Sequence, residues 1–450
     1  MAGMRSDPPA RLAADFAAAG VTDVECLFPD VSGHPRGKLM PAAAFASGAE
    51  LRIAQAIPMQ CVTGDYSYDP IFPDQDPDVL LVPDYASVRT VPWAGVPRAL
   101  AIHDCFELDG SPCEFAPRTV LKNVVARCAA LGLRALVAPE IEFYLTAPND
   151  DPAQPLRAPA LRRGRREVGQ SAFSLDTLNE HAPFWDEFRA ALRTLGVRTD
   201  TWIHEVGLSQ FEINLLHDDP LVVADQAFLF KYAAKEIALK HGMNAVFMAK
   251  PIAGQPGSSM HLHQSLVDAQ GRNVFSDPDG GESLLFGQYI AGLQAHLPSL
   301  TLMFAPNVNS YRRFVKHSQA PVNFHWGHDN RTAGLRIPKS GPAARRVENR
   351  VAGADANPYL VIAATLAAGL AGIERQLAPS PPMEDCAYDQ PQTLARTLLA
   401  AHTAFLADDV AVRLFGQRFV TAYAAVKELE FESYLAEIGA WERRFLVAQA

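Results

Sequence analysis

Acidic residues alternate with bulky apolar residues in one short segment of this 450-residue chain, and that alternation limits the fold more than any other feature. Residues 138–144 read APEIEFY, and the β-forming residues and the proline favour an extended strand. Side chains two residues apart on a strand point the same way, so Glu140 and Glu142 share one face. Two carboxylates ~7 Å apart on a buried face repel each other unless a cation lies between them. A strand with a solvated acidic face is the alternative interpretation.

The segment HEVGLSQFEIN favours a cation site, because it repeats the same alternation beside a turn. A turn at residues 207–209 would fold Glu205 back towards Glu212. Gln210, Glu212 and Asn214 alternate with apolar residues, so the polar side chains would face a site and the apolar ones a core.

Two histidines at strand spacing extend this polar face. His261 and His263 lie in the segment SSMHLHQS, and Gly257 just upstream would let a ligand approach the backbone closely. A single histidine is usually a satisfied core residue, whereas two on one strand face are harder to explain in that way. A further acid, Glu348, lies between two arginines that share its face.

Five glutamates and one of the two histidines would form an oxygen-rich ligand set, which predicts a site for hard divalent cations, Mg²⁺ or Mn²⁺. Such cations beside a row of arginines are what phosphoryl transfer needs, because both neutralise charge on phosphate oxygens. The chain has no P-loop pattern and no dinucleotide-binding glycine pattern, so we expect the nucleotide to bind in another way. The arginines available for this role are Arg312, Arg313, Arg331, Arg336, Arg345, Arg346 and Arg350.

Composition argues against several other classes of protein. The net charge of −10, with scattered acids, argues against a nucleic-acid partner, and the basic cluster at residues 157–166 is interpreted as a solvated loop. The six cysteines are widely spaced, which favours reduced thiols. The apolar residues 359–372 are too few for a ~20-residue membrane span and predict a buried helix. With no secretory signal visible and no membrane partner expected, we expect a cytoplasmic protein.

The order of patterns predicts an α+β chain with two domains. An amphipathic helix is expected over residues 1–20, with Leu12, Phe16 and Ala19 on its apolar face. A small domain of short strands follows over residues 21–106, and residues 107–117 have the composition of a linker. Residues 118–450 predict a large domain with an antiparallel sheet. The individual elements expected are strands at 24–28, 79–82, 99–103 and 133–145, a hairpin near residue 207, and helices at 118–131, 184–195 and 222–241.

Longer stretches resemble the glutamine synthetase family from about residue 21 to the C-terminus. They are RGK (36–38), PEIEFYL, HEVGLSQFEIN, PGSSMHLHQS, APNVNSYRRF, WGHDNRTAGLRIP and RRVENRVAGADANPYLV. The sequences of these motifs are most similar to those of the γ-glutamylpolyamine branch of the family, such as γ-glutamylputrescine synthetase. The resemblance implies a β-grasp domain over 21–106, a catalytic domain with a curved antiparallel sheet, and a homo-oligomer of stacked hexameric rings with active sites between neighbouring subunits.

The resemblance also implies a role for each matching residue. One metal would be held by Glu142, Glu205 and Glu212, and the metal on the ATP phosphates by Glu140, His261 and Glu348. Glutamate would be held by Gly257, Arg313 and Arg350. The nucleotide and its phosphates would be held by His263, Ser265, Arg331, Arg336 and Arg346. The expected catalytic residues are Arg331, Arg313 and Glu212.

The implied reaction is a magnesium- and ATP-dependent ligation of glutamate to an amine through γ-glutamyl phosphate. Ammonia-using members carry a glutamate in the flap where this chain has Gln319, and an aspartate motif that is missing near Asp65. We therefore expect a carbon-bearing amine, either a polyamine such as putrescine or a small alkyl or alkanol amine. Candidate walls and anchors for that amine are Asp65, Tyr66, Tyr68, Asp69, Phe324 and Trp326. The alternatives are an ammonia-using glutamine synthetase and an inactive relative that serves as a structural or binding protein.

Overall fold

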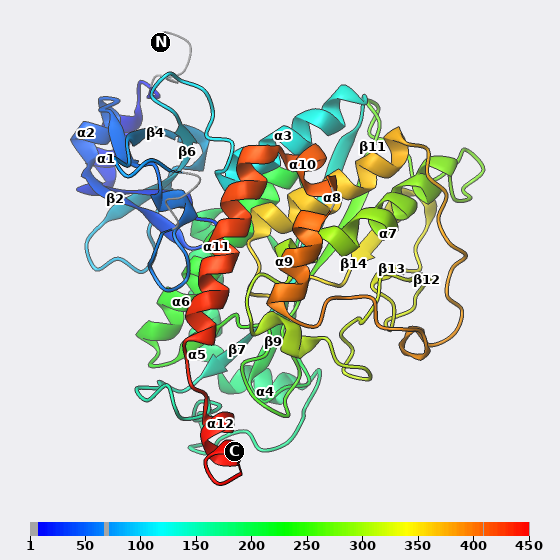
Figure 1. Ribbon diagram of the computed structural model, residues 1–450. Coiled ribbons are helices and arrows are strands. Elements are labelled where there is room, and N and C mark those ends of the chain that lie inside the picture. Colours follow the sequence, from blue (N-terminus) through cyan, green and yellow to red (C-terminus); the bar gives the residue numbers. More distant parts are fainter. Residues whose placement is uncertain (1–7, 67–71, 408, 450) are drawn as a thin grey trace.

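Two β-sheets organise the computed structural model, which describes residues 8–66, 72–407 and 409–449 (Figure 1). The chain is of the α+β class, as predicted. The strands are β1 (Asp23–Pro29), β2 (Pro35–Pro41), β3 (Leu51–Ala54), β4 (Asp78–Pro83), β5 (Arg89–Thr90), β6 (Arg98–Phe106), β7 (Arg134–Thr146), β8 (Thr199–His204), β9 (Gln210–Leu215), β10 (Asn244–Val246), β11 (Met260–Val267), β12 (Trp326–His328), β13 (Leu335–Ile337) and β14 (Val347–Asn349). The α-helices are α1 (Leu12–Ala19), α2 (Ala42–Ala46), α3 (Pro117–Ala130), α4 (Leu175–Glu180), α5 (Ala182–Leu195), α6 (Pro220–Lys240), α7 (Leu284–Phe304), α8 (Pro358–Glu374), α9 (Leu398–Ala407), α10 (Val410–Phe415), α11 (Gln417–Leu435) and α12 (Ala440–Leu446).

The first sheet has the strand order β2-β1-β6-β4-β3, with β5 paired to β6. Strand β1 pairs antiparallel with β2 and parallel with β6. The strands predicted at 24–28, 79–82 and 99–103 are confirmed as β1, β4 and β6.

The predicted N-terminal helix is wrong in two details. Helix α1 begins only at Leu12, after Pro8 and Pro9, because proline disfavours helical geometry in the residue before it and lacks the N–H of a helix interior. Phe16 is buried as expected, but Ala19 is exposed at the last helical position. Residues 1–7 of that prediction lie outside the described residues.

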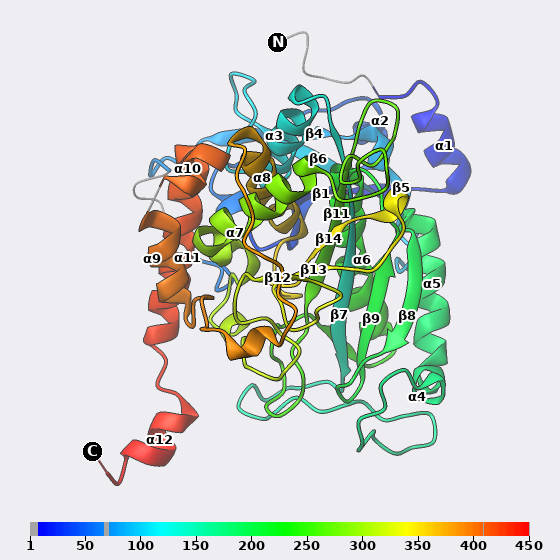
Figure 2. The same ribbon diagram turned by 90° about the vertical axis from the view of Figure 1, so that its right-hand side faces the viewer.

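The second sheet carries the polar face, in the order β12-β13-β14-β11-β7-β9-β8 with β10 paired to β7. Its pairings are antiparallel except that β12 and β13 run parallel. Strand β7 lies between β11 and β9, and Figure 2 shows β7, β9 and β8 side by side with α5 at their edge. The predicted strand at 133–145, the hairpin near residue 207 and the helices at 118–131, 184–195 and 222–241 are confirmed as β7, β8–β9, α3, α5 and α6.

The apolar helix predicted for residues 359–372 is confirmed as α8. Asn357 caps its N-terminus by accepting a hydrogen bond from the Tyr359 N–H (2.9 Å), and Pro358 occupies the first turn. Side chains along α8 are buried, and the helix packs along α7. Among the described residues, no helix has both the length and the apolar character needed to cross a bilayer.

Candidate active site

A cavity of about 610 Å³ opens over the polar face of the second sheet, between strand β7, the β8–β9 hairpin, strand β11 and the loops around residues 254–257, 313–320 and 331–336. The structure brings most of the residues predicted from the sequence to this one cavity. They are Glu140, Glu142, Glu205, Glu212, Gly257, His261, Arg313, Gln319, Arg331, Arg336 and Arg350.

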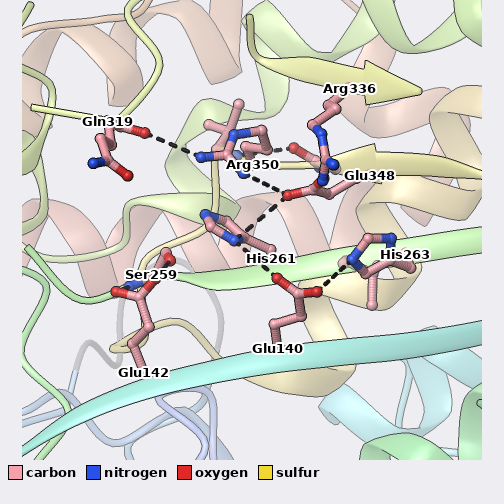
Figure 3. Close-up of polar contacts among 12 residues, drawn as sticks. Glu140, Glu142, Ser259, His261, His263, Gln319, Arg336, Glu348 and Arg350 are labelled. Carbon is pink, nitrogen blue, oxygen red and sulfur yellow. Dashed lines mark hydrogen bonds and ion pairs between the residues drawn. The ribbon is translucent and has the colours of Figure 1, made fainter. Parts of the chain in front are cut away.

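Glu140 lies between two imidazoles because β7 pairs antiparallel with β11 and places Glu140 opposite His261 (Figure 3). The Nε2 atom of His263 lies 2.8 Å from one carboxylate oxygen, and the Nδ1 atom of His261 lies 3.4 Å from the other. Burial by itself would raise the pKa of Glu140, but these two bonds hold the pKa below its ordinary value.

Glu142, Glu205 and Glu212 show the opposite behaviour. Register places Glu142 opposite Glu212, and burial followed by repulsion from Glu205 raises the pKa of Glu142 to about 7. Burial followed by repulsion from Glu142 raises the pKa of Glu212 to about 10, and burial also raises the pKa of Glu205. Three buried carboxylates with raised pKa values are a poor arrangement for an empty pocket and a good one for a cation, which takes the place of protons.

Glu348 is buried behind the cavity rather than lining it. One of its oxygens accepts a hydrogen bond from Arg350 Nη1 (2.6 Å), and the other accepts one from Arg336 Nη1 (2.7 Å). Burial would raise the pKa of Glu348, but Arg350 lowers it to about 2. Glu348 therefore lies near the ligand set as a carboxylate, and it also orients two of the predicted site arginines.

Two groups of potential ligand atoms lie close enough to hold a metal ion. Glu140, Glu212 and His261 form one group, and Glu140, His263 and Glu348 form the other, with the ligand atoms within 4.8 Å of one another in each. The donors are oxygen atoms with one imidazole, which suits Mg²⁺ or Mn²⁺. These groups differ from the two sets expected from the sequence in three ways. Glu142 and Glu205 belong to neither group, Glu212 lies with Glu140 and His261, and His263 lies at ligand distance rather than only on the nucleotide side.

A smaller cavity of about 360 Å³ adjoins the first and shares Glu140 and Asn214 with it. His263, Ser265 and Arg346 line it, and Arg346 Nε donates a hydrogen bond to His263 Nδ1 (3.2 Å). His263 and Ser265 were expected to contact the nucleotide. Of the three arginines expected on the phosphate side, Arg346 lines this smaller cavity, whereas Arg331 and Arg336 line the larger one. The other two arginines named from the sequence, Arg312 and Arg345, line neither of these cavities.

The residues expected to hold glutamate meet at one end of the larger cavity. A side chain at Gly257 would place its Cβ 2.5 Å from Arg313 Cγ and 2.7 Å from the Ala249 carbonyl oxygen, so only glycine fits there. Arg350 Nη2 donates a hydrogen bond to the Gln319 carbonyl oxygen (3.2 Å), which ties the flap to the site. Gln319 has a positive φ of 62° and lines the cavity.

The described residues among those expected to surround the amine do not line the cavity of this chain. Asp65 accepts a hydrogen bond from Thr63 Oγ1 (2.7 Å), and Tyr66 Oη accepts one from Gln60 Nε2 (2.7 Å). Phe324 and Trp326 are buried in the core, and Tyr68 and Asp69 lie outside the described residues. The correction has a physical reason: aromatic residues near a motif are drawn into the core by their large apolar area unless a cavity lies beside them.

The structure adds a wall that the sequence did not indicate. Phe173, Ile203, Val206, Gln170 and Lys250 line the larger cavity. Phe173 lies in a loop without periodicity, and its backbone φ of +63° is uncommon for a side chain of its size. In the sequence, the one signal for this wall was that residues 170–173 (QSAF) continue the loop that follows the basic cluster at residues 157–166.

The chain is similar in sequence to known enzymes over most of its length. The family model described as glutamine synthetase, catalytic domain, matches residues 114–446. A glutamate–isopropylamine ligase of a Pseudomonas species is 37% identical over 92% of each chain. A glutamine synthetase of Pyrococcus abyssi is 34% identical over 92% of this chain and 90% of its own. A γ-glutamylputrescine synthetase of Escherichia coli is 36% identical over 80% of this chain and 78% of its own.

A solved structure of a GmaS complex with ADP superposes with a TM-score of 0.83. It is 32% identical, and the match covers 96% of this chain and 98% of the other.

Proposed function

Because the chain belongs to the glutamine synthetase family, we propose that it is an ATP-dependent ligase that joins the γ-carboxylate of glutamate to an amine. The observation that carries this assignment is the convergence of buried carboxylates and arginines on one cavity, in a chain whose similar proteins include ligases for isopropylamine and putrescine. An amine ligase is favoured over an ammonia-using glutamine synthetase. Loss of catalysis would leave no reason to keep carboxylates buried at a mutual electrostatic cost.

In the proposed reaction an oxygen of the glutamate γ-carboxylate attacks the γ-phosphorus of ATP, and the bond from that phosphorus to the bridging oxygen breaks. ADP leaves and γ-glutamyl phosphate is formed. The nitrogen of the neutral amine then attacks the acyl carbon, the carbon–oxygen bond to phosphate breaks, and the proton released from the nitrogen passes to the departing phosphate. Arg331 and Arg336 would face the transferring phosphoryl group and stabilise its charge.

The donor set supports two divalent cations, Mg²⁺ or Mn²⁺, held by Glu140, Glu142, Glu205, Glu212, His261 and Glu348 in the roles that the family resemblance implies. When bound, such ions supply charge neutralisation at phosphate oxygens. Gly257, Arg313 and Arg350 would hold glutamate, and His263, Ser265 and Arg346 would hold the nucleotide in the smaller cavity.

The amine would enter beside the wall formed by Phe173, Ile203 and Val206. Phe173 is 71% exposed although it is a large apolar side chain, so a hydrocarbon group packed on it would gain from burial. Gln319 in the flap can form hydrogen bonds but carries no negative charge for a free ammonium ion. The substrate class is therefore a carbon-bearing amine, and Asp65 would contribute only from a neighbouring subunit.

The same proposal includes a homo-oligomer and the domain limits expected from the sequence. Helix α12 leaves the body of the subunit in both views (Figures 1 and 2). Trp441 in this helix is 65% exposed, and Val447 just after it is 80% exposed. Such a helix is better suited to a neighbouring copy than to water. The mixed sheet of residues 21–106 supports a β-grasp domain, with residues 107–117 as the linker and 118–450 as the catalytic domain. A cytoplasmic location remains a prediction.

The decisive experiment measures phosphate release with glutamate, ATP and Mg²⁺ over a panel of isopropylamine, ethanolamine, putrescine and ammonium at equal concentrations. We expect at least one alkylamine to be used faster than ammonium. Faster release with ammonium would make this chain a glutamine synthetase. Absence of release with every amine, together with no rise in melting temperature on adding ADP and Mg²⁺, would identify an inactive relative.

A further inference from the structure

A buried carboxylate outside the predicted metal cluster connects two parts of the cavity wall. Glu167 is only 9% exposed, and its Oε2 atom accepts a hydrogen bond from the Ser209 backbone N–H (2.7 Å). The same oxygen lies 3.2 Å from His204 Nε2 and 3.4 Å from Ser209 Oγ. Glu167 belongs to the loop before α4, whereas His204 and Ser209 belong to the β8–β9 hairpin, so these bonds join two elements far apart in sequence.

Ser209 needs such a partner because of its backbone conformation. Its φ is +54°, in the left-handed region that costs free energy for a residue other than glycine. Ser209 is fully buried, so an N–H without an acceptor there would add the penalty of an unsatisfied polar group. A carboxylate is the strongest acceptor available to a backbone N–H.

The turn that Glu167 holds leads directly to the site. Glu205 N–H donates to the Gln210 carbonyl (2.8 Å), and Gln210 N–H donates to the Gly207 carbonyl (3.0 Å). The Gln210 side chain then donates from Nε2 to Glu142 Oε2 (3.2 Å) and to the Gly257 carbonyl (2.9 Å). A shift of the turn would therefore displace both Glu205 and the amide that orients Glu142.

The other side of the same contact holds the apolar wall. The Phe173 N–H donates to the His204 carbonyl (2.8 Å), so the loop is fixed to the hairpin at two points six residues apart, Glu167 and Phe173. Gln170, which lies between these two points, and Phe173 itself both line the cavity.

We infer that Glu167 is a positioning residue that clamps the loop of residues 167–173 to the β8–β9 hairpin and thereby fixes the amine side of the cavity. It touches no substrate and acts through Ser209, His204 and the loop. The part of this inference that concerns the amine rests on the proposed function, whereas the clamp itself does not.

The test compares Glu167→Ala, Glu167→Gln and the matched control Glu180→Gln in the full-length protein. Glu180 pairs with Arg163 of the same loop but makes no bond to the hairpin. Two quantities are measured: hydrogen–deuterium exchange in peptides that cover residues 204–211, and the KM values for the amine and for ATP. In Glu167→Ala we expect exchange in the hairpin to be ~10-fold faster, the KM for the amine to rise severalfold, and the KM for ATP to change less than about twofold.

Glu167→Gln keeps an oxygen acceptor and loses the charge, so we expect exchange about threefold faster and a smaller rise in the same KM. If the alanine variant does not fold, the glutamine variant decides alone. Unchanged exchange in the hairpin would overturn the clamp. An equal rise in the KM for the amine and in the KM for ATP would overturn its link to the amine side. If the unmodified protein ligates no amine, the proposed function fails, and the exchange measurement still decides whether Glu167 clamps the hairpin.

Discussion

At the scale of single residues, the site is defined by carboxylates that the fold keeps close together against their repulsion. Glu142 and Glu212 face each other across two neighbouring strands, and both have raised pKa values because burial and nearby negative charge favour the protonated form. Their neighbour Glu140 has a lowered pKa because two imidazoles contact it. Protons and cations therefore compete for the same face of the sheet.

This competition predicts how Mg²⁺ and pH act together on stability. In the folded, metal-free protein, Glu142 and Glu212 keep their protons up to pH values of about 7 and about 10. In the unfolded chain the same carboxyl groups release their protons above the ordinary glutamate pKa of ~4.3. The stability of the folded protein therefore falls as the pH rises through about 7 and about 10. Mg²⁺ replaces those protons, so the rise in melting temperature caused by Mg²⁺ should be larger at pH 8 than at pH 6. Thermal unfolding with Mg²⁺ or with a chelator at both values checks this. In Glu212→Gln most of the difference should disappear; an equal rise at both pH values would contradict the prediction.

The predicted metal ligands indicate which substitution should abolish ADP release. Glu212→Ala removes a carboxylate from the face that would bind the cation, so we expect Mg²⁺-dependent ADP release to fall by ~100-fold or more. A coupled assay for ADP measures it. Glu282→Ala changes an exposed acid on the loop before α7 and should have no effect. Full, metal-dependent ADP release by the Glu212 variant would refute its role.

The flap predicts a change in amine preference. Gln319→Glu places a negative charge at the cavity where the flap has a neutral amide, so the ratio of kcat/KM for ammonium over that for isopropylamine should rise by ~10-fold or more. Steady-state phosphate release with both amines gives the ratio. Gln417→Glu, an exposed position at the start of α11, is the matched control. An unchanged ratio would show that Gln319 does not select the amine.

At the scale of elements, strands β7, β9 and β11 of the second sheet each bring two or more polar residues to one face while their alternate residues enter the core. Register then decides which pairs meet: β7 places Glu140 against β11 and Glu142 against β9. A shift by one residue would turn both glutamates into the core, so pairing and site are specified together. The N-terminus of helix α8 is joined to the segment just after strand β1. Asn357 caps the helix, and its side-chain amide also donates hydrogen bonds to the Asp30 and Val31 carbonyl oxygens.

Two substitutions at Asn357 separate these two contributions. Asn357→Ala loses the cap and both long-range hydrogen bonds, and we expect the free energy of unfolding to fall by ~2–3 kcal/mol. Asn357→Ser keeps a capping oxygen and loses the two long-range donors without burying a charge, so its loss should be about half as large. Denaturant unfolding measures both changes. Ser174→Ala removes a cap at the short helix α4 alone and should cost no more than ~1 kcal/mol; an equal loss at the two positions would contradict the long-range role of Asn357.

At the scale of the whole molecule, the distribution of apolar surface points to assembly. Ile438, Trp441, Phe445 and Val447 are exposed on a C-terminal segment that projects from the body of the subunit (Figure 2). Asp65 and Tyr66 do not line the cavity of their own chain. Both features are expected of a subunit that completes its site, and covers its tail, against another copy.

Removal of residues 436–450 should therefore reduce the size of the assembly without unfolding the subunit. Light scattering after size-exclusion chromatography measures the mass, and circular dichroism checks the fold. The double variant Trp441→Ala/Phe445→Ala tests the apolar contacts separately and should reduce the mass in the same direction. An unchanged mass in both variants would show that the tail does not hold subunits together.

The residues of the polar face could be predicted from the sequence because their signal is local. Strand periodicity is two residues, so alternating acids and apolar residues in residues 138–144 and 210–214 fix which side chains share a face before any pairing is known. The same reasoning predicted β7, the β8–β9 hairpin and α8. It failed at the start of α1, where two prolines outweigh the pattern, and it could not place Phe324 or Trp326, whose burial depends on neighbours distant in the sequence.

The sequence by itself determined the chemistry of the polar face, since carboxylate, imidazole and guanidinium groups at strand spacing follow from the order of residues alone. The tertiary structure alone decided which of those groups meet. It paired Glu348 with Arg336 and Arg350, and it brought His263 to Glu140. It also placed Phe173 in the wall of the cavity and Glu167 against the β8–β9 hairpin, both from a loop that has no period. The physical reason is that loops are fixed by contacts across the fold rather than by repeating backbone geometry, so their side chains acquire a position only when the rest of the chain has folded.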